Sequence, residues 1–101
     1  MMVMDELLQR IRRKYPGLLY RRPSESNIIA TGKLAKKLID NYGKEKGYFS
    51  IDLDLLALHY KVERDALAFS LFIRGCLFHK IEDAFMVGLT SNAIKDHNHE
   101  Y

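Results

Sequence analysis

Lysine and arginine side chains, which can bind phosphate groups, are unevenly distributed along this chain of 101 residues. Residues 1–47 contain 11 Lys and Arg against 5 Asp and Glu, a formal charge of +6, whereas residues 48–101 contain 5 against 8, a charge of −3. Because nucleic-acid binding depends on clustered positive charge, the first half is a candidate phosphate-binding surface. Alternatively, these side chains cover apolar surface with their aliphatic stems. The basic residues concerned are Arg10, Arg12, Arg13, Arg21, Arg22, Lys33, Lys36 and Lys37.

The sequence contains no pattern typical of an enzyme. It lacks a phosphate-binding glycine loop, a metalloprotease motif and a paired-cysteine site, and its carboxylates are scattered. We therefore expect no catalytic residue, no cofactor, no metal and no small-molecule substrate. His59 and His79 could meet near Cys76 and bind a metal, but nothing in their spacing requires it. We expect Cys76, the single cysteine, to be a small buried side chain rather than a reactive thiol.

A short strand and a helix are predicted to begin the second half of the chain. Tyr48–Phe49 is a pair of residues that favours β-structure. Ser50 suits a helix N-cap because its hydroxyl can accept a hydrogen bond from the next turn. Ile51, Leu55 and Leu58 then recur at helical spacing and Leu56 widens this stripe, which predicts that they form the buried face of the helix.

A second helix and a hairpin are predicted to follow almost at once. Val62, Leu67 and Leu71 can pack back on the preceding helix, and the very short connection requires the two helices to cross steeply. Residues 77–81 and 84–89 indicate two strands, because apolar residues alternate or run continuously on either side of an acidic tip.

A helix, a tight turn, a second helix and a hairpin, in this order, resemble the winged helix-turn-helix family of DNA-binding domains. The resemblance covers about half of the chain. It predicts an α+β, mainly helical domain, in which the wing hairpin and a short strand form a small antiparallel sheet and an N-terminal helix is added. The matching residues are Leu56 and Ala57 in the first helix, Val62 after the turn, Leu67 and Leu71 in the second helix, and Gly75 and Leu77 before the wing.

In one respect the sequence departs from the family pattern. Gly75 follows Val62 more closely than the corresponding glycine does in many members of the family. The second helix therefore either ends about one turn early or continues through Gly75.

The resemblance implies a homodimeric transcription regulator that binds double-stranded DNA. In the family, the second helix enters the major groove and its N-terminal part reaches base edges. Arg64 is at that place here, where an arginine can make a bidentate contact to guanine. For Arg64 and Lys80, an ordinary solvated charge is the alternative. Further candidates for contacts to phosphate or to the groove margin are Lys61, Arg74, His79 and Lys80, with Lys33, Lys36 and Lys37 on the preceding helix.

The alternative function is a protein-interaction or dimerisation module without DNA binding. Phe69 and Phe72 lie in the second helix, where exposed aromatic residues would form a docking surface. The acidic tip of the wing would also repel a phosphate backbone. The apolar face of the N-terminal helix, with Leu7, Leu8 and Ile11, could pair with its copy in a second subunit.

The first half of the chain predicts two further helices. The first has an apolar face and stops at Pro16–Gly17, and residues 18–22 then read as extended, with a strand as one possibility. Ser24 or Ser26 can cap the next helix, for which Gly43 suits the C-terminal end. The apolar face of the first helix consists of Met4, Leu7, Leu8, Ile11 and Tyr15.

Length and hydropathy predict a single domain over residues 1–101. We divide it into an N-terminal helix and extended segment (1–23), a winged-helix core (24–90) and a short C-terminal helix or frayed tail (91–101). No apolar run approaches the roughly 20 residues of a membrane span, and the opening Met-Met-Val-Met is too short for a secretory signal. We therefore expect a cytoplasmic protein without a membrane partner.

Overall fold

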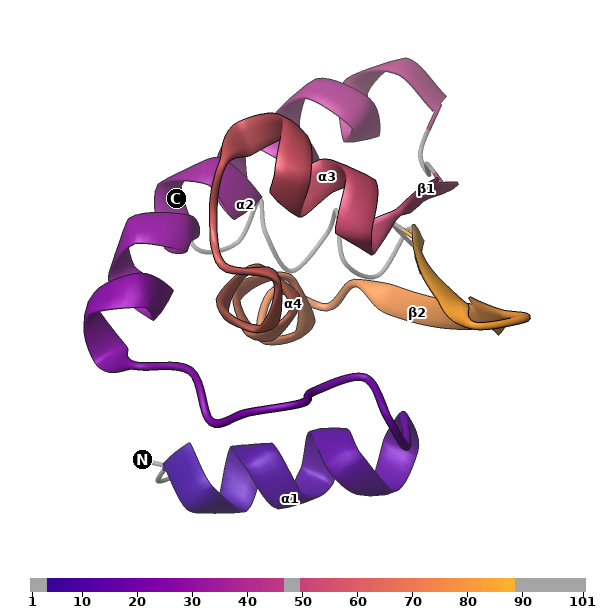
Figure 1. The fold of residues 1–101 in the computed structure, drawn as a ribbon. Helices are drawn as coiled ribbons and strands as arrows, with labels where there is room; N and C mark the ends of the chain where they lie inside the picture. The colour runs from indigo at the N-terminus through magenta and orange to yellow at the C-terminus, as the bar shows by residue number, and fades with distance from the viewer. Residues whose placement is uncertain (1–3, 47–49, 89–101) are drawn as a thin grey trace.

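The computed structural model describes residues 4–46 and 50–88, with side chains defined for 4–41 and 51–88, as helices packed on a small sheet (Figure 1). The strands pair antiparallel in the order β1-β3-β2, which confirms the expected α+β, mainly helical class. The predicted strand at Tyr48–Phe49 and the tail 91–101 lie outside the described residues. The elements are α1 (Met4–Lys14), α2 (Glu25–Lys46), β1 (Ser50–Asp52), α3 (Leu53–Tyr60), α4 (Arg64–Phe72), β2 (Leu77–Ile81) and β3 (Ala84–Gly88).

Ser24 begins α2, as one of the two predicted caps. Its Oγ accepts a hydrogen bond from the backbone N–H of Asn27 at 3.2 Å, and its carbonyl accepts one from Ile28 at 3.0 Å. The helix continues to Lys46, so the predicted end at Gly43 is wrong. A glycine inside a helix costs about 1 kcal/mol relative to alanine, which does not outweigh the helix-forming lysines and glutamate that follow it.

The cap of α3 lies two residues later than the sequence pattern suggests. Ser50 is not a cap, because it belongs to β1 and pairs with Gly88. Asp52 caps the helix instead, and its Oδ1 accepts hydrogen bonds from the N–H groups of Asp54 at 2.8 Å and Leu55 at 3.3 Å. A carboxylate at this place also complements the positive end of the helix dipole.

The buried stripe of α3 differs from the predicted one. Leu56 is buried as predicted, together with Leu53, whereas Leu55 and Leu58, both predicted to face inward, are 60% and 75% exposed. α3 begins at Leu53, and the face that contacts α4 and β3 contains Leu53 and the residues three and four positions later, Leu56 and Ala57. Two leucines of α3 are therefore left on the surface.

The connection from α3 through α4 to the sheet is tight. Lys61 ends α3 in the left-handed conformation, with φ at 57°. Leu67 and Leu71 in α4 are fully buried, as predicted. The helix ends at Phe72, and Gly75 then turns the chain with φ at +92°. Of the two alternatives left open for this helix, the early end is confirmed.

The hairpin forms as predicted from its apolar strands. In its register, Phe78 lies opposite Val87 and Ile81 lies opposite Ala84, so that Glu82 and Asp83 form the connecting loop. Phe78 and Val87 face the core. β1 then adds to the outer side of β3 as the third strand.

α1 and the chain that follows it lie against α4, on the side opposite α3 (Figure 1). We call residues 4–22 the N-terminal arm. Leu8, Ile11 and Leu18 in the arm are buried in the same apolar cluster as α4. Residues 18–22 form no strand and bend at residues 18, 20 and 21, so the extended conformation expected there is not observed. The arm therefore belongs to the core of the described structure.

Candidate nucleic-acid interface

The helix expected to read DNA is enclosed within the structure. All residues from Asp65 to Leu71 are buried. Phe69 is a member of the core, so its assignment to an interface is wrong. Phe72 is half-buried, with its ring edge-on to that of Tyr15 at 6.2 Å between centroids. Only the two ends of α4 can reach a ligand in this arrangement.

The apolar face of α1 is likewise used inside the molecule. Leu8 and Ile11 are buried, so their assignment to a dimer interface is wrong. Leu7 is half-buried and packs against the same cluster. The periodicity of α1 correctly indicated an amphipathic helix, but its apolar stripe packs within the chain, around α4.

Arg64 at the start of α4 is bound to protein groups on several sides. Its side chain is only 14% exposed. Its guanidinium donates to the carbonyl of Leu18 at 2.6 Å, forms ion pairs with Asp65 at 2.8 Å and Asp54 at 2.5 Å, and lies 4.3 Å from the ring centroid of Tyr20. A contact to a base edge would require breaking these interactions, so the geometry does not favour Arg64 as a base reader.

Asp65, the next residue, also binds the arm. Its Oδ2 accepts hydrogen bonds from the backbone N–H groups of Tyr20 at 2.9 Å and Arg21 at 2.8 Å. Together, Arg64 and Asp65 satisfy one carbonyl and two N–H groups of the arm. These adjacent opposite charges act as a clamp on the arm, a role that their position at a helix start did not reveal.

The arm carries six exposed Lys and Arg side chains. Residues 7–24 contain six Lys and Arg and no Asp or Glu, and all six are exposed. Arg22 forms an ion pair with Asp5. We call this set the arm cations. They are Arg10, Arg12, Arg13, Lys14, Arg21 and Arg22.

The hairpin extends this basic surface. Tyr15 packs edge-on against Phe78 of β2, with 5.3 Å between the ring centroids. Lys80 lies two residues after Phe78 and therefore on the same face of the strand. Its ammonium group is 5.8 Å from the ring centroid of Phe85. The C-terminal end of α1 and Lys80 thus share one side of the hairpin, while His79 is exposed on the other face.

The remaining basic candidates are dispersed. Arg74 folds back and donates to the carbonyl of Ser70 at 3.1 Å. Lys61 is exposed at the end of α3. Lys33 and Lys37 are exposed on the side of α2 opposite its buried Ala35, and Lys36 is half-buried. These residues lie on α2, at the end of α3 and after α4, and not on the arm.

Cys76 is buried, as predicted. Burial raises the pKa of its thiol to about 12, although the nearby charge of Arg74 lowers it in part. His59 is exposed and stacks edge-on with Tyr60, with 4.7 Å between the ring centroids. Within residues 4–46 and 50–88, no three His, Cys, Asp or Glu side chains come together as metal ligands would.

A buried pair of hydroxyl groups joins α2 to α4, and the sequence reading did not identify it. Thr31 Oγ1 lies 2.7 Å from Ser70 Oγ, and both side chains are buried. Ser70 Oγ is also 3.3 Å from the carbonyl oxygen of Ile28, and Thr31 Oγ1 is 3.2 Å from that of Ala66, so one hydroxyl can donate to the other while the second donates to a carbonyl. Polar residues within apolar helical stripes were the available signal.

No protein-family model, no curated protein and no solved structure matches this chain. None of the helices in the described ranges combines the length and the apolar composition that crossing a membrane requires.

Proposed function

We propose that this chain is a winged helix-turn-helix domain that binds double-stranded DNA through phosphate contacts made by its N-terminal arm. The order α2, β1, α3, α4, β2, β3, with β1 paired to β3, supports the winged-helix assignment. The observation that carries the binding proposal is the run of six exposed arm cations without an intervening carboxylate.

Phosphate contacts from this surface need no base reading. Arginine and lysine side chains fix a protein on the backbone through charge and hydrogen bonds, which carry no sequence information by themselves. The burial of α4 removes the element that would read the major groove. The arm cations, and not Arg64, therefore make the main contacts to DNA. Lys80 adds a contact from the hairpin.

The hairpin tip limits how the DNA can lie. Glu82 and Asp83 are exposed at the tip and would repel phosphates. Lys80 is two residues away on the side shared with α1. We therefore propose that the duplex lies along α1 and meets the hairpin at Lys80, on the side shared with α1, without contacting Glu82 and Asp83.

The salt dependence of binding tests this proposal. Fluorescence anisotropy with a labelled mixed-sequence duplex should give affinity that falls steeply between about 50 and 200 mM salt, because bound phosphates release counterions. A second duplex of unrelated sequence should bind equally well. Absence of binding at the lowest salt would contradict the proposal.

A matched pair of variants locates the contacts. Arg10→Ala with Arg13→Ala removes two charges from α1, and Lys33→Ala with Lys37→Ala removes two from α2. The first pair should lower the slope of log affinity against log salt by about 1.8, since each phosphate contact contributes about 0.9. The second pair should leave it unchanged. The reverse result would place the interface on α2.

A further inference from the structure

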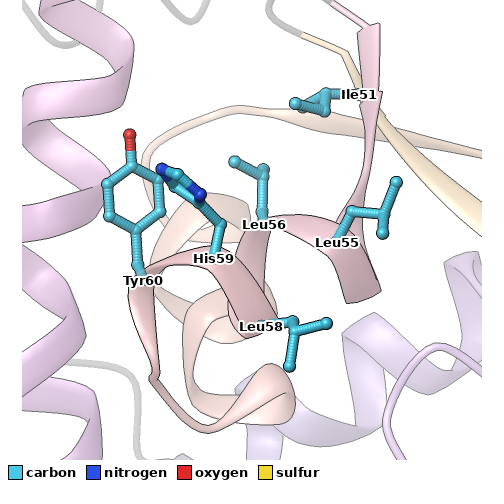
Figure 2. Close-up of a pocket in the computed structure, with 6 residues that line it drawn as sticks. All are labelled: Ile51, Leu55, Leu56, Leu58, His59 and Tyr60. Carbon is cyan, nitrogen blue, oxygen red and sulfur yellow. The ribbon is translucent and has the colours of Figure 1, made fainter.

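The outer face of α3 carries an apolar surface that no element of the described structure covers. Leu55 is 60% exposed and Leu58 is 75% exposed. With Ile51 of β1 and the rings of His59 and Tyr60 they line an open groove of about 470 Å³ (Figure 2). We call this surface the α3 face. Because burying apolar side chains is favourable, exposed leucines grouped in this way mark an interaction site.

The charges along α3 are arranged in a way that fits a copy of itself. Asp54 and Leu58 are four residues apart and lie on one side of α3, and Lys61 follows the last residue of the helix as its C-cap, so the three form a row from the start of α3 to its end. The row is acidic at its start, apolar in its middle and basic at its end. Asp54 contacts Arg64, but its side chain is still 56% exposed. Lys61 is also exposed.

We propose that the α3 faces of two copies of this chain pack antiparallel across a two-fold axis. The axis would pass near Leu58, so that the leucines of the two copies meet. Asp54 of each copy would then lie beside Lys61 of the other. The two helix dipoles would be antiparallel, which is the favourable arrangement.

Self-association fits this face better than a different partner does. In a two-fold interface, one surface patch serves both copies, so every contact is made twice and the assembly closes at two. The row from Asp54 to Lys61 has this self-complementary pattern. A different protein would have to supply a basic group opposite Asp54 and an acidic group opposite Lys61. A second copy of this chain already has both.

The dimer is independent of the arm cations and of the proposed DNA binding. It uses α3, whereas the arm lies against the opposite side of α4 (Figure 1). If both proposals hold, a dimer would present two basic arms, and linked arms bind DNA more tightly than one arm alone. Because dimerisation is measured without DNA, either proposal can fail while the other stands.

Analytical ultracentrifugation over a range of protein concentrations tests the dimer. The mass should rise from 11.8 kDa towards twice that value as concentration increases. Leu58→Lys should shift the transition to at least tenfold higher concentration. Ile29→Lys is the matched control, because Ile29 on α2 is also 75% exposed, and it should change nothing. Circular dichroism would establish that both variants remain folded.

A second pair of variants tests the charge arrangement. Lys61→Asp would place two like charges beside each other in the dimer and should weaken association several-fold. Lys33→Asp makes the same change of charge on α2 and should not. A chain that stays monomeric at all concentrations would overturn the proposal. So would a dimer that is unaffected by both Leu58→Lys and Lys61→Asp, since its interface would lie elsewhere.

Discussion

The guanidinium of Arg64 donates a hydrogen bond to the backbone carbonyl of Leu18, 46 residues earlier in the chain and 2.6 Å away. This contact joins the first turn of α4 to the N-terminal arm. Asp65 adds two hydrogen bonds to the same segment. Under the proposed winged-helix assignment, α4 corresponds to the helix that is open to the major groove in members that read DNA. Here the arm occupies that side, so the charged residues of α4 hold the fold together.

Removing the Asp65 carboxylate should weaken the attachment of the arm to α4. Asp65→Ala leaves two N–H groups of the arm without their acceptor and removes one of the two ion pairs of Arg64, and we expect the free energy of unfolding to fall by about 3 kcal/mol. Urea denaturation measures this loss. Asp83→Ala at the exposed hairpin tip is the control and should change stability by less than about 0.5 kcal/mol. Equal effects of the two substitutions would show that the clamp contributes nothing.

The hydroxyl pair between α2 and α4 should behave as a coupled unit. Thr31→Val and Ser70→Ala should each lower the free energy of unfolding by about 1–2 kcal/mol, because each leaves a buried hydroxyl short of a partner. The double variant should lose about 1 kcal/mol less than the sum of the two. A double-mutant cycle in urea measures this coupling, and strict additivity would mean that the two hydroxyls do not interact.

The tip of the hairpin should tolerate glycine at one position and not at the next. Glu82 has φ at 56°, a conformation that glycine adopts without strain. Glu82→Gly should therefore raise the free energy of unfolding by about 0.5 kcal/mol. Asp83→Gly removes the same charge without relieving a positive φ and should lower stability. Thermal unfolding of the two variants gives the sign of each change.

Alkaline pH should destabilise the protein through Cys76. Burial raises the pKa of its thiol to about 12, from the ordinary cysteine value of 9.0. Above pH 9 the unfolded state loses this proton while the folded state keeps it, so unfolding becomes easier as pH rises towards 12. The loss should approach about 1.4 kcal/mol per pH unit. Cys76→Ala lacks this contribution, and the difference between the two proteins in urea denaturation at pH 8 and pH 10 isolates it.

Local signals in the sequence predicted the hairpin and the helix pair well. Strands 77–81 and 84–88 follow from apolar residues on either side of an acidic two-residue loop. The early end of α4 is consistent with Gly75, which the turn requires at φ +92°. The start of α3 was missed because Ser50 and Asp52 are both good N-caps, and only the pairing of Ser50 with Gly88 decides between them.

The enclosure of α4 depends on contacts that local patterns do not show. Residues 66–72 contain no charged side chain, and a helix without a polar stripe is usually buried on all sides. The absence of charged residues therefore indicated that α4 is buried, but the resemblance to winged helices led us to expect it on the surface. The roles of Arg64 and Asp65 could not be predicted, because their partners lie more than 40 residues away in an irregular segment.

Nuclear magnetic resonance titration of the ¹⁵N-labelled chain with duplex DNA tests the account most directly, because it reports which residues meet the ligand. The predicted result is a set of chemical-shift changes at Arg10, Arg13, Lys14 and Lys80, with the amides of α4 unchanged and the same pattern for duplexes of different sequence. Changes confined to Arg64 and its neighbours in α4, or no changes at low salt, would contradict it.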